Sequence, residues 1–334
     1  MQNLRVGTFN LFQFVKPPYS WYEPKSTFSL KEWNLKTTWI KKQLCDMNCD
    51  IVGFQEVFSK DTLEILTKES GFVHFTTVDI AKLDTKNQTT FKSTTVALAS
   101  KYPILELQEV KPNQKTIDKH KLENDFKFSR TPLKALIQLP NNLQITVYVN
   151  HFKSNRSNEL EYTFTKNHSL DNKIEKTKEA LDQNISKSLK QRLCETSSLF
   201  FDFQKTKTPI ISLCDLNDKE FSLSIEALTN EAYHEKATTT NTYLLNDVYD
   251  LIDKTIYNPH PEQKEIQRTP TSYFQGYGNV LDYIFVSNDF DKNIKNHIGE
   301  VISYEIFNKH LHNNPHGSLL QSDHAQVVCE IKMK

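Results

Sequence analysis

Carboxylate, amide and imidazole side chains recur in this chain at the ends of short apolar segments. The residues concerned are Asn10, Glu56, His151, Asp215, Asn217, Asp282, Asp323 and His324. Glu56, Asn10 and Asp323 offer hard oxygen atoms, which favour Mg²⁺, or Mn²⁺ as a substitute, over Zn²⁺. Zinc would require more histidine or cysteine ligands. A divalent cation surrounded by acids, bases and hydrogen-bond donors is suited to phosphoryl transfer.

Proton transfer is the second kind of chemistry that these residues suggest. Asp215 and Asn217 are two positions apart, so in extended geometry one can accept a proton from water while the other holds that water. His151 and His324 could stabilise the charge that grows on phosphate oxygens, with Asp282 orienting one imidazole. Each residue alone is better explained as a polar strand end, and residues 215–217 as an Asx turn. The recurrence of the pattern along the chain favours one shared site.

The apolar segments next to these residues predict buried β-strands, because they are short and rich in Val, Ile, Tyr and Phe. Segments end at Asn10, Glu56, His151 and Asp215, and others begin at Asp282 and Ser322. If antiparallel partners alternate, these starts and ends meet at the same edge. The sequence therefore predicts a cluster of polar groups at one edge of a β core.

Helices are predicted between the strands, which indicates an α/β protein. Ser29 and Glu32 form a capping box before an amphipathic helix. Ser59 is placed to begin a second helix and Gly71 to end it. A third helical pattern runs from about residue 178 to 203, while Pro140-Asn141-Asn142 predicts a hairpin turn.

Length and motif order predict a single catalytic domain over residues 1–334. Asn10 and His324 lie near opposite ends of the chain, so a site that uses both requires the whole chain as one unit. Polar stretches near 111–128, 153–175 and 230–271 are predicted to be surface insertions.

Charge, cysteine content and hydropathy exclude several classes of protein. Lys and Arg together number 41, as do Asp and Glu together, so the net charge is zero. Proteins that bind nucleic acid mainly through net charge usually have a surplus of basic residues, which this chain lacks. A local basic rim is still compatible with the sequence. Five cysteines, mostly within apolar segments, suit reduced thiols. Because no signal peptide or transmembrane segment is recognisable, we expect a cytoplasmic protein.

Taken in order, the motifs resemble those of the endonuclease/exonuclease/phosphatase superfamily, which includes pancreatic deoxyribonuclease, abasic-site endonucleases, neutral sphingomyelinases and inositol polyphosphate 5-phosphatases. The matching segments are TFN at Asn10, FQE at Glu56, ALASKYPI, FSRTPLKA at Arg130, VNHFKS at His151, CDLND at Asp215, LDYIFVS at Asp282 and SDHAQV at His324. The resemblance implies a four-layer α/β/β/α sandwich of two mixed, largely antiparallel sheets flanked by helices. It also implies cation-dependent hydrolysis of a phosphoester.

The resemblance also assigns roles to individual residues. Its metal ligands correspond to Glu56, with Asn10 and Asp323 beside it. The catalytic residues correspond to Asp215, which activates water, its orienting partner Asn217, the transition-state donor His151, and the dyad of Asp282 and His324. Arg130 corresponds to the arginine that grips the phosphate. One departure is Cys214, which stands where the family usually has glycine.

The substrate is predicted from the surroundings of these motifs. Lys153 and Arg156 follow His151 and, with Arg130, would bind a phosphate backbone or a polyphosphorylated small molecule, or they are simply exposed loop residues. Aromatic residues between 12 and 22 could stack on bases, contact a lipid or cover the core. We therefore expect a magnesium-dependent phosphodiesterase with nuclease-like activity and no protein partner. The alternatives are hydrolysis of a lipid or inositol phosphoester, and a binding module with vestigial chemistry.

Overall fold

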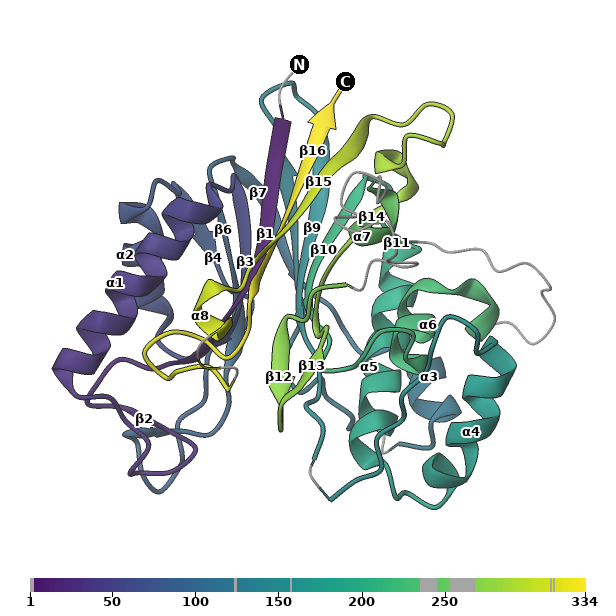
Figure 1. Cartoon of the computed structure of the whole chain (residues 1–334), viewed down its shortest axis with the longest axis horizontal. Coiled ribbons are helices and arrows are strands. Elements are labelled where there is room, and N and C mark those ends of the chain that lie inside the picture. The colour runs from purple at the N-terminus through teal and green to yellow at the C-terminus, as the bar shows by residue number, and fades with distance from the viewer. Residues whose placement is uncertain are drawn as a thin grey trace.

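Two mixed β-sheets of six strands each pack face to face in the computed structural model of this chain (Figure 1). The structure describes residues 3–122, 125–156, 158–234, 245–252, 268–312, 314 and 316–334. The first sheet has the order β15-β16-β1-β3-β6-β4. Its strands are β1 Asn3–Phe14, β3 Ile51–Val57, β4 His74–Thr76, β6 Thr95–Ser100, β15 Gly299–Phe307 and β16 Gln326–Met333.

The second sheet has the order β11-β14-β10-β9-β8-β7. Its strands are β7 Ile104–Glu109, β8 Leu133–Gln138, β9 Gln144–His151, β10 Ile210–Asp215, β11 Leu245–Asp247 and β14 Asp282–Ser287. Strands β8 and β9 form the antiparallel hairpin predicted around residues 140–142. Two smaller pairs complete the strands: β2 Ser20–Trp21 with β5 Thr90–Phe91, and β12 Ser272–Phe274 with β13 Tyr277–Asn279.

Helices cover the outer faces of both sheets. The first sheet is covered by α1 Leu30–Met47 and α2 Lys60–Glu69, and the second by α5 Lys187–Phe203 (Figure 1). Further helices are α3 Gln114–Lys119, α4 Leu170–Asp182, α6 Leu223–Thr229, α7 Val248–Leu251 and α8 Lys309–His312. This arrangement confirms the predicted α/β/β/α sandwich. None of the helices in the described part of the chain has the length and apolar character needed to cross a membrane.

The helix ends follow the local sequence. Ser29 accepts a hydrogen bond from the backbone of Glu32, and the Glu32 carboxylate accepts one from the backbone of Ser29, which confirms the capping box of α1. Ser59 begins α2 without a side-chain cap, and Gly71 follows the helix with a φ of 94°. Glycine suits that left-handed position because it lacks a Cβ atom.

Branched aliphatic side chains fill the space between the two sheets. Val6 and Ile51 of the first sheet belong to the same buried cluster as Val149 and Leu213 of the second. At Gly53 the sheets approach so closely that a Cβ atom would lie 3.0 Å from Leu213 and 3.1 Å from Val149. The glycine therefore permits this spacing of the two sheets.

Strand direction brings the polar strand ends together. Strand β1 runs parallel to β3, and β9 runs parallel to β10, so all four end at the same side of the molecule. Strands β14 and β16 are antiparallel to β10 and β1 and therefore begin there. The expected convergence is confirmed. Antiparallel pairing brings the starts of β14 and β16 beside the ends of β10 and β1, and parallel pairing adds the ends of β3 and β9.

Three predicted segments differ in detail. The pattern from 178 to 203 contains two helices instead of one, because α4 ends at Asp182 and Asn184 adopts a left-handed φ of 55° before α5 begins. The stretch near 111–128 contains α3, whose N-cap Asn113 accepts a hydrogen bond from the backbone of Lys115. Of the stretch near 230–271, residues 235–244 and 253–267 lie outside the described residues, and β11 and α7 lie between them.

Candidate active site

Asp215 is the last residue of β10 and is fully buried where the two sheets meet. Its Oδ2 accepts a hydrogen bond of 2.9 Å from the Asn10 side-chain amide at the edge of the first sheet. Its Oδ1 accepts one of 3.0 Å from the backbone N–H of Asn217, which completes an Asx turn. Burial raises the pKa of Asp215 to about 7, although His324 and these hydrogen bonds act in the opposite direction. A carboxylate with a pKa in this range is suited to act as a general base near neutral pH.

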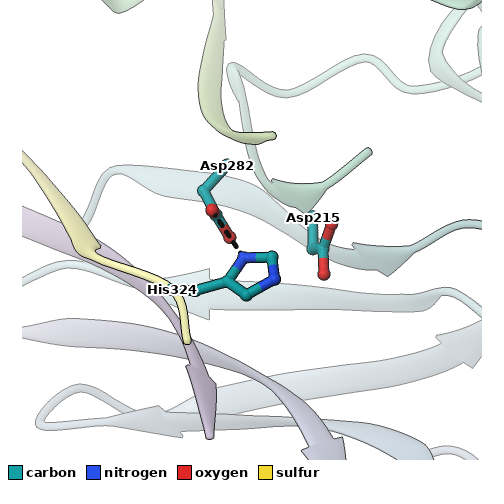
Figure 2. A group of neighbouring side chains, drawn as sticks. All are labelled: Asp215, Asp282 and His324. Carbon is teal, nitrogen blue, oxygen red and sulfur yellow. Dashed lines mark hydrogen bonds and ion pairs between the residues drawn. The ribbon is translucent and has the colours of Figure 1, made fainter. Parts of the chain in front are cut away.

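Asp282 and His324 form a buried dyad beside Asp215 (Figure 2). His324 Nδ1 lies 2.8 Å from Asp282 Oδ2. Burial alone would lower the pKa of His324, but the carboxylates of Asp282 and Asp215 raise it well above its ordinary value. The imidazole is therefore held as a cation. Thr271, which sequence reasoning missed, accepts hydrogen bonds from the backbone N–H groups of Leu281 and Asp282 and so fixes the start of β14.

His151 ends β9 on the other side of Asp215. Its Nε2 lies 3.4 Å from Asp215 Oδ2, and its Nδ1 is buried with no hydrogen-bond partner in the described part of the chain. Burial, with smaller contributions from Arg130 and His324, lowers the pKa of His151 well below its ordinary value. The site thus contains one neutral and one cationic imidazole.

Glu56 lies at a bulge near the end of β3, where the pairing of β3 with both neighbouring strands shifts register. It adopts a left-handed φ of 59° and is half-buried. A bulge redirects a side chain, and such conformations are concentrated at functional sites. The Glu56 carboxylate accepts a hydrogen bond of 2.9 Å from the backbone of Gln13, whose φ of 61° is also left-handed.

Asp323 faces the same region from the loop before β16. Burial raises the pKa of Asp323 to about 6, Glu56 contributes in the same direction, and the cation of His324 opposes both. Among the residues that the structure describes, Asp323 Oδ1 is buried without a hydrogen-bond partner, whereas Asn10 Oδ1 already accepts a hydrogen bond from the backbone of Phe12. An unpartnered buried carboxylate oxygen next to a second carboxylate fits a hard divalent cation. Asn10 is better placed to orient Asp215 than to act as the main ligand.

A second set of possible ligands is formed by Asp215, Asp282 and His324, whose ligand atoms lie within 4.8 Å of one another. We favour Glu56 and Asp323 for the cation, because a histidine must be neutral to bind a metal. The carboxylates around His324 keep it protonated instead.

The predicted phosphate-binding residues lie close to one another at the edge of the second sheet. Arg130 donates a hydrogen bond of 3.0 Å to the backbone carbonyl of Phe152, and both Arg130 and Arg156 lower the pKa of Lys153, after the larger effect of burial. Asn217 donates to the same carbonyl through its side-chain amide. The three cations therefore form one basic rim beside His151.

Two buried residues of α5, which sequence reasoning missed, hold this rim. Glu195 accepts hydrogen bonds from the backbone of Ser129 at 2.7 Å and of Lys153 at 2.8 Å. Arg192 donates to the Lys153 carbonyl and pairs with Asp218. The only local signal for these residues is a charged side chain at a helix position where the sequence pattern predicts burial.

Tyr22 is the residue of the aromatic stretch that reaches this region. Burial raises the pKa of Tyr22, with a smaller contribution from the nearby Glu56 carboxylate, and the nearby Arg130 guanidinium acts in the opposite direction. Other members of the stretch, such as Phe14 and Trp21, are buried in the core. The stretch therefore both covers the core and contributes to the site.

Known structures share this architecture. The human Nocturnin catalytic domain with bound sulfate aligns with a TM-score of 0.56 and 16% identity over 99% of this chain and 94% of that one. D. rerio TDP2 complexed with a single-strand DNA product aligns with a TM-score of 0.52 and 11% identity over 100% of both chains. A Bacteroides thetaiotaomicron mannosyl-6-phosphatase gives a TM-score of 0.52 and 13% identity over 98% of this chain and 99% of that one.

Other structures of similar score are described as endonuclease/exonuclease/phosphatase family proteins. No protein-family sequence model and no curated protein sequence matches the chain. The chain combines this two-sheet architecture with acidic and imidazole groups at one edge of the sheets. The chain has the fold of the endonuclease/exonuclease/phosphatase superfamily, as the motifs predict.

Proposed function

We propose that this protein is a Mg²⁺-dependent phosphoester hydrolase, and specifically a phosphodiesterase with nuclease-like activity. The observation that carries the proposal is the environment of Asp215. It is a buried carboxylate held by Asn10 from one sheet and by the Asn217 backbone from its own loop, beside an imidazolium dyad. All of these groups come from strand ends that are far apart in the sequence.

In the proposed mechanism, Asp215 removes a proton from the attacking water. Asn10 and the Asn217 backbone orient the carboxylate through their hydrogen bonds to its two oxygens. The His324 imidazolium, held by Asp282, donates a hydrogen bond to a phosphate oxygen as negative charge develops there. His151, which is neutral, supplies a second N–H donor.

Glu56 and Asp323 would hold the divalent cation, with Asn10 beside them. Bound there, the cation would polarise the phosphoryl group and neutralise part of its charge. Mn²⁺ is an expected substitute because it accepts the same oxygen ligands.

The choice of a nucleic acid backbone as substrate is supported by the basic rim of Arg130, Lys153 and Arg156 beside His151. Phosphate groups along a backbone are held by such side chains, and Tyr22 adds an aromatic surface near Arg130. D. rerio TDP2, which shares the fold, is described in complex with a single-strand DNA product. Residues 1–334 would act as one catalytic domain, since Asn10 and His324 contribute from opposite ends.

A panel of substrates, with and without a chelator, tests this proposal. Purified protein should cleave single-stranded DNA or RNA and bis(p-nitrophenyl) phosphate in Mg²⁺, and EDTA should abolish the activity. Cleavage of sphingomyelin, an inositol phosphate or a sugar phosphate instead would replace the nuclease with the alternative hydrolases. No turnover of any of these with Mg²⁺ or Mn²⁺ would favour a binding module with vestigial chemistry.

A further inference from the structure

A lysine on α1 is completely buried next to the candidate metal site. Lys36 has an exposed fraction of 0%, and its Nζ donates hydrogen bonds to three backbone carbonyls. The distances are 2.8 Å to Phe12, 2.7 Å to Leu319 and 2.9 Å to Gln321. An ammonium group has three protons, so all of its donors are used.

Lys36 interrupts the buried face of α1. The other buried residues of this helix are Trp33, Ile40, Leu44 and Met47. An apolar residue would continue that face at no cost, whereas burying a charge is expensive unless it is paired and hydrogen-bonded. Burial lowers the pKa of Lys36 to about 7, and the nearby carboxylates of Glu56 and Asp323 oppose this shift. The three carbonyl acceptors and the rings of Phe12 and Phe28 favour the ammonium form.

The three carbonyls belong to the end of β1 and to the loop before β16, which form the metal side of the site. Phe12 has a left-handed φ of 49° and precedes Gln13, whose backbone N–H donates to the Glu56 carboxylate. Leu319 and Gln321 lie in the loop that leads to Asp323. Lys36 therefore joins the end of β1, which orients Glu56, to the loop that carries Asp323.

We propose that Lys36 is a positioning residue that sets the separation of the Glu56 and Asp323 carboxylates for a divalent cation. In the described hydrogen bonds, Lys36 donates to neither carboxylate, so it acts through the backbone segments that hold Glu56 and Asp323 in place. The inference rests on the proposed function, because it requires that these two residues bind the metal.

Positioning and charge predict opposite results for removal of the ammonium group. Without Lys36 the two carboxylates lose a neighbouring positive charge, which by itself would strengthen cation binding. Loss of their fixed separation would weaken it. The weakening should be larger for Mg²⁺ than for Ca²⁺, because Mg²⁺ requires near-ideal octahedral geometry and Ca²⁺ tolerates irregular sites.

The test measures cation binding without substrate. The unfolding temperature of the full chain is followed as MgCl₂ or CaCl₂ is added, which yields a dissociation constant for each ion. We expect Lys36→Met to weaken Mg²⁺ binding by about 10-fold or more and Ca²⁺ binding by about threefold or less. Lys36→Arg, which keeps the charge but not the compact three-proton geometry, should give an intermediate Mg²⁺ constant.

Lys173→Met is the matched control. Lys173 is also a buried lysine, 3% exposed, but it lies on α4 and pairs with Glu226 of α6. Its variant should lose stability and keep both dissociation constants.

Unchanged or tighter Mg²⁺ binding in Lys36→Met overturns the inference, as does equal weakening for both ions. If Lys36→Met does not fold, Lys36→Arg decides, and a wild-type Mg²⁺ constant in that variant overturns the inference. No response of the wild-type protein to either ion would instead contradict the proposed function.

Discussion

The two halves of the candidate site are built differently. In the proton-transfer half, Asp215 and Asp282 lie at the ends of β10 and β14 of the second sheet, and His324 joins them from the segment before β16 of the first sheet. All three side chains are buried and hydrogen-bonded. In the other half, Glu56 lies at a bulge of the first sheet, its partner Gln13 has a left-handed backbone, and Asp323 retains a buried oxygen that is unpartnered among the described residues. Hydrogen bonds thus orient the proton-transfer half, whereas the half that contains Glu56 and Asp323 places two carboxylates near each other for a cation.

Because of this difference, we expect substitutions in the two halves of the site to have different effects on turnover and cation binding. Damage to the proton-transfer half should slow the chemical step and leave cation binding intact. Damage to the half that contains Glu56 and Asp323 should remove cation binding, and turnover with it. Variants that affect only the sandwich or its outer helices should change stability and spare both.

The largest effect is expected for Asp215→Asn, which keeps the shape of the side chain and removes the base. Turnover should fall by about 10³-fold, within the range for loss of a general base. Steady-state kinetics at saturating Mg²⁺ would measure this loss. Asp202→Asn is the control, because Asp202 is a carboxylate of α5 that pairs with Lys134 and Tyr148 away from the site. Turnover of Asp215→Asn within tenfold of wild type would remove Asp215 from its role.

Asp282→Asn should have the next largest effect, a loss of about 10²-fold in turnover. Because burial raises the pKa of Asp215 to about 7, wild-type activity should fall as the pH drops below 7 and the base becomes protonated. On the alkaline side, activity should fall as the His324 cation loses its proton. Asp282 raises the pKa of His324, so its removal should move this alkaline limb to lower pH.

A pH–rate profile of both proteins checks the prediction. Asp289→Asn, beyond the far end of the same strand, should leave the profile unchanged. An alkaline limb that stays in place in Asp282→Asn would show that the dyad does not control the essential imidazole.

Gly53→Ala should lower the stability of the sandwich and spare the chemistry of the site. A Cβ atom there would lie 3.0 Å from Leu213 and 3.1 Å from Val149 between the sheets. Overpacking of this kind typically costs about 1–3 kcal/mol of unfolding free energy. Urea unfolding measures the change, and an unaltered midpoint would mean that the sheets are not so closely packed at this point.

The smallest effect concerns His120, which is buried next to His234 and far from the dyad. Burial, followed by Lys119 and His234, lowers the pKa of His120 to about 3. A folded-state pKa below the unfolded value of about 6.5 contributes no pH dependence above that value. As the pH falls below it, the unfolded chain is protonated first, and stability is lost by about 1.4 kcal/mol per pH unit. His120→Leu should reduce this slope in urea unfolding between pH 6.5 and 5, and an unchanged slope would contradict the assignment.

Much of the fold, and the placement of polar residues near strand ends, could be predicted because the sequence signals are local. Val, Ile and Phe in short runs identify strands, and a strand end fixes where the next polar residue emerges. The capping box at Ser29 is contained within four residues. The pairing of β1 with β3 and of β9 with β10 has no local signal, because the sequence of a strand does not indicate whether its partner is parallel or antiparallel.

Residues that support the site through other residues could not be predicted in the same way. Lys36, Glu195 and Tyr22 lie in segments whose sequence is explained by a helix or a loop alone, and their partners are distant in the chain. The break between α4 and α5 has only a weak local signal. Asn can adopt the left-handed conformation that ends a helix, as Asn184 does, but Asn also occurs within helices.

The most direct test of the account is a Mg²⁺ titration of thermal unfolding for wild type, Glu56→Gln and Asp215→Asn. The account predicts a Mg²⁺-dependent rise in unfolding temperature for wild type and Asp215→Asn and none for Glu56→Gln, although neither variant turns over substrate. A wild-type rise in Glu56→Gln would contradict the claim that strand ends of both sheets form one cation-dependent site.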